Sequence, residues 1–236
     1  MNTVVIGVDP GKDGAITAIA ISDRVVKYIA SIPTPTYVKT LSTRRKVKKL
    51  TPEQIAAGKK PKKPGFKTKS IIDFNEMSRF VHEIQSRSTG KIVAYVEEVT
   101  AMPGQGVVSM FSFGEAFGLV VGVLSGSGCE VKFTRPQKWK KDIFPKGKLA
   151  DKEMAIEIAQ KLFPNFSFKK TSKCTTYHDG MAESALIAFW GGVQEGIVDQ
   201  VKFEGVESKI DDDVLSALED IKIEDIKPVK KRSRKL

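Results

Sequence analysis

The chain of 236 residues contains little cysteine and histidine, with two of each. Two cysteines are too few for a disulfide framework, and no CxxC pair offers a zinc site. The sequence also lacks an uninterrupted apolar run of the roughly 18 residues that cross a membrane. Its first residues do not show the basic region, apolar stretch and cleavage site of a signal peptide. These absences argue against the secreted and membrane classes. We expect a cytoplasmic protein in a reduced compartment, with no membrane partner.

The excess positive charge is concentrated in one segment. The chain has 39 Lys and Arg against 28 Asp and Glu, a formal net charge of +11. Residues 39–69 hold twelve basic residues and one acid, Glu53, so this segment alone equals the net charge. Prolines and glycines interrupt it, which favours a solvated loop over a packed element. It is either a solubilising insertion or a segment that contacts nucleic-acid phosphates. We favour the second interpretation.

The C-terminal segment is also patterned by charge. Residues 199–225 contain ten acids and three lysines, and six basic residues follow them. Within 211–225, Val214, Leu218 and Ile221 recur at helical spacing. We expect a short helix there that docks on the core or binds a protein partner. The basic tail, PVKKRSRKL, either binds nucleic acid or, in a eukaryotic host or its virus, directs import into the nucleus.

The apolar patterns predict one mixed α/β domain. Short β-branched runs at 3–9, 15–21 and 25–31 are separated by turn residues, which is typical of an antiparallel meander. The later elements are predicted as helix 72–87, strand 92–99, helix 106–124, strand 130–134, helix 150–163 and helix 178–192. We find no internal repeat. The predicted organisation is a domain over 1–196 with a basic insertion at about 34–70, followed by an appendage over 197–236.

Four acids occupy positions that need an explanation. Asp9 ends the first strand, Glu97 lies near the end of strand 92–99, and Asp179 and Glu183 share one face of the last helix. An acid in an apolar element is costly unless it is paired or binds a cation. Carboxylate oxygens select Mg²⁺ or Mn²⁺ over Zn²⁺. Each acid alone can be a helix cap or a surface charge, so the prediction of a metal site depends on their order along the chain.

The stretches around these acids resemble the three acidic motifs of RuvC-type Holliday-junction resolvases, which have the ribonuclease H-like fold. Here they read IGVDPGKDGAIT, YVEEV and HDGMAESALIA. The stretches MPGQG, SFG and P-x-x-WKK resemble the phage-borne and chloroplast branch of that family. The resemblance covers about residues 3–31 and 71–192. It implies a mixed five-stranded sheet flanked by helices.

The resemblance also implies an activity, that of a crossover junction endodeoxyribonuclease in DNA recombination and repair. Such an enzyme is a homodimer that cuts four-way DNA by paired symmetric nicks. Asp9, Glu97, Asp179 and Glu183 would hold two Mg²⁺ ions, for which Mn²⁺ substitutes, and Lys152 would face the scissile phosphate. The expected DNA contacts are Lys140, Lys141, Lys148, Met102, Gln105, Arg44, Arg45, Lys62 and Lys63. The family pattern has an aromatic residue where this chain has Thr100, so stacking on junction bases is not carried over.

Other functions stay open at this point. A nuclease of the same chemistry can act on forks or flaps, because selectivity comes from dimer geometry and junction shape. A non-catalytic junction-binding protein is a second alternative, although clustered carboxylates do not help a protein to bind a polyanion. An actin-like ATPase or sugar kinase also begins with strand-Asp-x-Gly, but it needs a second lobe. His178 either assists proton transfer or shapes the start of the last helix.

Overall fold

A five-stranded mixed sheet forms the centre of the molecule. The computed structural model describes residues 3–44, 49–60, 65–100, 104–144 and 151–198. The strands are β1 (Thr3–Asp9), β2 (Ala15–Ser22), β3 (Val25–Pro33), β6 (Ile92–Glu97) and β7 (Glu130–Thr134), in the order β3-β2-β1-β6-β7. The first three pair antiparallel, whereas β1, β6 and β7 pair parallel. This strand order is that of the ribonuclease H-like fold, so the predicted fold class is confirmed.

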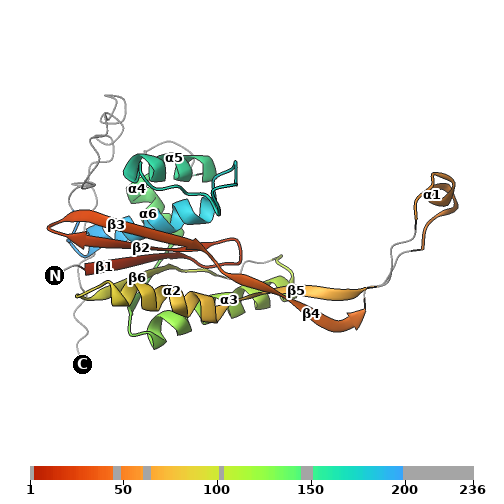
Figure 1. Ribbon diagram of the computed structural model, residues 1–236, viewed down its shortest axis with the longest axis horizontal. Coiled ribbons are helices and arrows are strands. Elements are labelled where there is room, and N and C mark those ends of the chain that lie inside the picture. The colour runs from red at the N-terminus through yellow and green to blue at the C-terminus, as the bar shows by residue number, and fades with distance from the viewer. Residues whose placement is uncertain (1–2, 45–48, 61–64, 101–103, 145–150, 199–236) are drawn as a thin grey trace.

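Helices cover both faces of the sheet (Figure 1). One face carries α4 (Pro136–Ile143), α5 (Lys152–Leu162) and α6 (Asp179–Gln194), and the other carries α2 (Phe74–Ser86) and α3 (Val107–Gly126). Successive residues of a strand point to opposite faces. Val5 therefore packs in the cluster that contains α6, whereas Val4 and Ile6 pack with α2 and α3. The same alternation directs the side chains of Asp9 and Glu97 toward α6.

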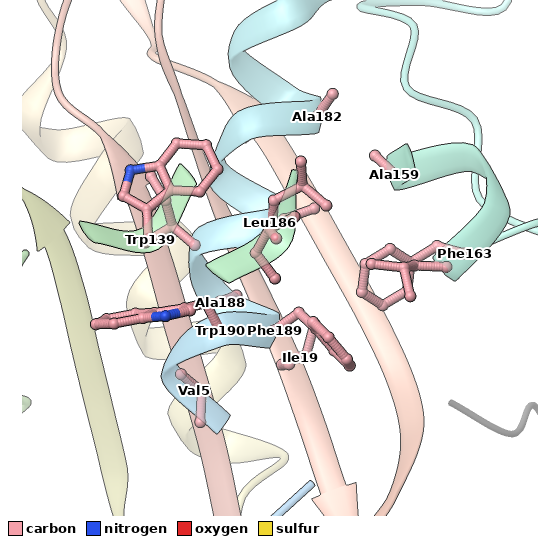
Figure 2. Packing of buried hydrophobic residues seen from close by; sticks show 14 of the residues in the cluster. Val5, Ile19, Trp139, Ala159, Phe163, Ala182, Leu186, Ala188, Phe189 and Trp190 are labelled. Atoms are coloured by element: carbon pink, nitrogen blue, oxygen red, sulfur yellow. The ribbon is translucent and has the colours of Figure 1, made fainter. Parts of the chain in front are cut away.

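The helix α6 is buried along almost its whole length. Every residue from Gly180 to Val193 is buried except Glu183, and a helix that is apolar all round belongs inside a core. Figure 2 shows this helix against the sheet and the neighbouring helices, with Leu186, Phe189, Trp190, Val5, Ile19 and Phe163 among the packed side chains. This packing holds Glu183 on a rigid element.

Contact between α6 and β1 depends on one glycine. A Cβ atom at Gly7 would clash with the backbone of Ser184 and Ala188. The absence of a side chain lets the helix lie directly on the strand that ends in Asp9. The sequence analysis did not single out this glycine, because only the packing shows why it is needed.

The two ends of the basic insertion are strands and not the loop that the sequence suggested, so that part of the prediction was wrong. β4 (Thr36–Arg44) and β5 (Phe66–Ile72) pair as an antiparallel ribbon, and a short helix, α1 (Pro52–Ala56), lies between them in the chain. β-branched and aromatic residues alternate with lysines in these strands, and this alternation is typical of β structure. In Figure 1 the ribbon projects away from the sheet. The sequence analysis also missed α4, whose single buried face is too short to give a clear period.

The helix α3 is the one helix in the described residues that is long and apolar enough to cross a membrane, by length and composition alone. The sequence analysis found no such run because Glu115 interrupts it. One helix of this kind is weak evidence for a membrane, since core helices pass the same test. Unlike a core helix, however, α3 is mostly exposed, and the exposed fractions of Val107, Val108 and Phe111 are 83%, 81% and 71%.

The buried core includes the last described residue. Val198 is buried and packs close to Gly192, so the core extends at least two residues past 196. The predicted helix at 211–225 and the basic tail lie outside the described residues.

Candidate active site

Three elements bring four carboxylates together at one edge of the sheet. Asp9 ends β1, Glu97 ends the neighbouring strand β6, and Asp179 and Glu183 lie in the first turns of α6. The strands β1 and β6 are parallel neighbours, so their carboxyl ends meet at the same edge. The acids that the sequence singled out are therefore close in space.

Asp9 is the carboxylate whose ionisation is most disfavoured. Its pKa is raised from 3.8 to about 7, first by burial and then by the charges of Glu183, Glu97 and Asp179, while the charge of Lys140 acts in the opposite direction. Burial also raises the pKa of Glu97, while a hydrogen bond to its carboxylate lowers it. Asp9 and Glu97 therefore create an electrostatic demand for a nearby cation.

Two lysines meet part of this demand. Nζ of Lys140 lies 2.6 Å from Oε1 of Glu183. Nζ of Lys152 forms an ion pair with Oδ2 of Asp179. Burial raises the pKa of Asp179, but the hydrogen bond and the charge of Lys152 outweigh it and lower the pKa overall. Four carboxylates thus face two ammonium groups, which leaves a formal excess of two negative charges.

The donor set fits a divalent metal ion by its chemistry. All the donors are carboxylate oxygens, which Mg²⁺ and Mn²⁺ prefer, and the excess charge matches one such ion. In the described ranges no three His, Cys, Asp or Glu side chains stand close enough to enclose an ion. Lys140 and Lys152 act as counter-ions of Glu183 and Asp179 in this arrangement.

The short helix α4 positions two of the carboxylates. Trp139 is fully buried, and its indole Nε1 donates a hydrogen bond of 2.8 Å to Oε1 of Glu97. Its neighbour Lys140 pairs with Glu183 and lies 5.1 Å from the centre of the indole ring. Figure 2 shows that Trp139 also packs beside α6. The sequence analysis noted the WKK stretch but missed the bond from Trp139 to Glu97.

The start of α6 is shaped by His178. This residue is the N-cap of the helix, and its Nδ1 accepts a hydrogen bond of 3.1 Å from the amide of Met181. Of its two suggested roles, the structure displays the one at the helix start. A Cβ atom at Gly180 would clash with the backbone of Asp13 and Gly14, so the first turn of α6 approaches the loop after β1 closely. The positive end of the helix dipole therefore lies beside the carboxylates.

A buried hydroxyl cluster fixes α6 on the sheet. Oγ1 of Thr17 on β2 lies 2.6 Å from Oγ of Ser184 and donates a hydrogen bond of 2.7 Å to Oγ of Ser31. Ser184 also donates to the carbonyl of Met181 at 3.0 Å. Because Ser184 follows Glu183, this cluster helps to fix the direction of that carboxylate. A serine within an otherwise apolar helix was the available signal, and the sequence analysis did not use it.

The other predicted contacts have different positions. Lys141 on α4 and Gln105 just before α3 are exposed. Arg44 is the last residue of β4, where only the backbone is described. The predicted contacts outside the described residues are Arg45, Lys62, Lys63, Met102 and Lys148. Glu98 faces away from Glu97, as strand alternation predicts, and its Oε2 lies 3.2 Å from Nε of Arg135.

Comparisons with known proteins give a likeness in structure only. No family model matches the chain, and no curated protein matches it in sequence. Among solved structures it is similar to T. thermophilus RuvC in complex with a Holliday junction substrate, with a TM-score of 0.43 and 15% identity over 84% of this chain and 99% of that one. A second Thermus thermophilus RuvC structure gives a TM-score of 0.40 at 15% identity, with the same coverage of both chains. The finer assignment to the phage-borne and chloroplast branch stays a prediction from the motifs.

Proposed function

We propose that this chain is a metal-dependent endonuclease that resolves four-way DNA junctions by paired symmetric nicks. The observation that carries the proposal is the meeting of Asp9, Glu97, Asp179 and Glu183 at one edge of a ribonuclease H-like sheet. Such a cluster repels a phosphodiester unless cations are bound with it. Together with the basic character of the chain, it supports phosphodiester hydrolysis over DNA binding alone.

The four carboxylates would hold Mg²⁺ or Mn²⁺, which activates water and stabilises charge on the leaving oxygen when bound. The sheet edge keeps Asp9 and Glu97 at fixed positions, and the Trp139 indole orients Glu97. The side chain of Lys152 is 75% exposed, so it can leave Asp179 and neutralise charge on the phosphate. Lys140 is less exposed and stays close to Glu183.

Paired nicks require two active sites, and α3 offers a surface for a second copy of the chain. One stripe of this helix consists of Val107, Phe111, Gly114, Gly118 and Gly122, which follow one another at intervals of three or four residues. A Cβ atom at any of the three glycines would have nothing within 4 Å. Small residues let two helices approach closely, and an exposed apolar stripe favours a partner that covers it. These features support a homodimer formed through α3.

The test is cleavage of a labelled immobile four-way junction, beside linear duplex and a flap, with Mg²⁺ and with EDTA. We expect symmetric nicks in the junction that need Mg²⁺. Glu97→Gln should abolish cutting while junction binding persists. Glu98→Gln is the matched control, since this neighbouring glutamate faces away from the site, and it should cut normally.

Cutting of every branched substrate would replace the proposal with a general debranching nuclease. Binding without cutting under every metal tried would make the protein an architectural one.

A further inference from the structure

The β4–β5 ribbon begins at the edge of the sheet that carries the candidate active site. Asp9 pairs with Ala15 across β1 and β2, and Ala15 pairs with Pro33 across β2 and β3. Strands lie about 4.8 Å apart, so Pro33 is roughly 10 Å from Asp9. β4 starts only three residues after Pro33. The ribbon therefore projects from the edge where the four carboxylates meet.

An ion pair joins the base of the ribbon to the domain. Nζ of Lys69 on β5 lies 3.0 Å from Oε2 of Glu115 on α3. The helix α3 follows Glu97 in the chain after a short connection. The base of the ribbon is thus held beside α3, and Figure 1 shows the ribbon continuing outward from that point.

The two faces of the ribbon differ in chemistry. The pairs Tyr37–Ile71 and Lys39–Lys69 share one face, and Lys67 joins them because it is two residues from Lys69. The pairs Thr36–Ile72, Val38–Ser70 and Thr40–Thr68 form the opposite face. We call the face with Tyr37, Lys39, Lys67 and Lys69 the basic face.

The ribbon is poorly stabilised by the chain itself. Residues 36–40 and 65–68 are all exposed, so neither face is covered over that length. A two-stranded ribbon alone is marginally stable, and Lys39 lies opposite Lys69, whose charge Glu115 already balances. Neither Lys39 nor Lys67 has an acidic partner at ion-pair distance among the described residues. A polyanion on the basic face would supply the missing charge.

We propose that the basic face of the β4–β5 ribbon binds the phosphate backbone of a DNA duplex that leaves the active site. Nine strand residues span about 30 Å, close to one turn of B-DNA, and the major groove admits a two-stranded ribbon. Single-strand binding uses successive aromatic platforms, whereas the described part of the basic face has one aromatic ring, Tyr37. The identity of this duplex as an arm of the enzyme's substrate rests on the proposed function. The binding test below does not depend on that function.

The experiment compares Lys39→Gln/Lys67→Gln with a control that removes the same charge elsewhere, Lys91→Gln/Lys161→Gln. Lys91 precedes the start of β6, at the sheet edge away from Glu97, and Lys161 lies on α5. Binding to a linear duplex of about two helical turns is measured in EDTA by fluorescence anisotropy, between about 50 and 200 mM salt. We expect the ribbon variant to lower the slope of log affinity against log salt by about one to two and the affinity by about tenfold. The control should leave the slope unchanged.

An unchanged slope in the ribbon variant, or an equal loss in the control, would overturn the inference. Equal loss on single-stranded DNA of the same length would overturn the assignment to duplex. Because the assay contains no metal, it reports on the ribbon whether or not the wild-type protein cuts junctions. If the ribbon variant has a lower salt slope but the wild-type protein does not cut junctions, only the proposed function is refuted.

Discussion

The indole Nε1 of Trp139 donates a hydrogen bond of 2.8 Å to Oε1 of Glu97, and the ring is fully buried beside α6. This bond favours the charged form of Glu97, whose pKa burial raises. Trp139→Phe keeps much of the apolar volume and removes the donor. If Glu97 binds metal, the Mg²⁺ concentration for half-maximal cleavage should rise about 3- to 10-fold, with a smaller change at saturating Mg²⁺.

The matched control for this variant is Trp190→Phe. Trp190 is equally buried, and its Nε1 donates a hydrogen bond of 2.8 Å to Asp142, an acid that is not one of the four in the site. Its replacement should affect stability and leave the Mg²⁺ dependence unchanged. A similar Mg²⁺ shift in both variants would mean that the effect comes from packing and not from the bond to Glu97.

Asp9→Asn should stabilise the metal-free protein. The pKa of this carboxyl is about 7 in the folded state against 3.8 in the unfolded state, mainly because the group is buried. Between about pH 4 and 7, the folded protein therefore keeps a proton on Asp9 that the unfolded chain releases. The free energy of unfolding decreases as pH rises through this range. At pH 8 in EDTA, we expect Asp9→Asn to raise the free energy of unfolding by about 1–3 kcal/mol, an advantage that shrinks toward pH 4.

Urea unfolding at pH 5 and pH 8 measures this effect. Asp151→Asn, at the N-cap of α5, is a control of the same chemistry, since asparagine caps helices as well as aspartate does. Mg²⁺ should stabilise the wild type more than Asp9→Asn. An Asp9→Asn protein that is no more stable than the wild type at pH 8 would contradict the charge balance described for the site.

Glu195 should stabilise the folded domain at neutral and alkaline pH but not at acidic pH. This carboxylate accepts a hydrogen bond of 2.7 Å from the Tyr95 hydroxyl and pairs with Lys132. Burial raises its pKa, but the bonds from Lys132 and Tyr95 outweigh burial and lower it overall. Its stabilisation is therefore present above pH 4.5 and is lost as pH falls through the lowered pKa. Glu195→Gln should cost about 1–2 kcal/mol at pH 7, and this cost should decrease as pH falls below 4.5.

Thermal unfolding across this pH range tests the role of Glu195. Glu83→Gln, on the exposed face of α2, removes a surface ion pair with Arg87 and should cost well under 1 kcal/mol. A Glu195→Gln penalty that stays constant down to pH 3 would show that charge is not its source.

Gly118→Leu should weaken the dimer without destabilising the monomer. A side chain at this position meets nothing within 4 Å in the single chain, and replacing a helical glycine improves helix propensity by up to about 1 kcal/mol. The isolated monomer should therefore become slightly more stable. If two α3 helices cross at the glycine stripe, the same substitution should weaken dimerisation at least tenfold in sedimentation equilibrium. A wild-type chain that remains monomeric and partitions onto phospholipid vesicles would instead favour a membrane role for α3.

The sequence predicted the elements of the sheet well because their apolar patterns are local. The strand Thr3–Asp9 and the helix Asp179–Gln194 were located within one or two residues, and their acids were recognised as out of place. The β4–β5 ribbon was missed because its lysines give a polar composition, while its pairing depends on residues far apart in the chain. The bond from Trp139 to Glu97 was missed for a related reason, since it joins residues 42 positions apart. Composition and periodicity contain no information on such a contact.

The base of the ribbon has a consequence for how this chain can change over evolutionary time. The amide of Asp73 donates a hydrogen bond of 2.8 Å to the carbonyl of Pro35, so the chain leaves the domain and returns to it at one point. Apart from Ile72, which packs in the core with α2 and α3, the described residues between these two form no part of the five-stranded sheet. A lineage can therefore lengthen, shorten or exchange the outer part of this segment while the carboxylates and the strands that hold them stay as they are.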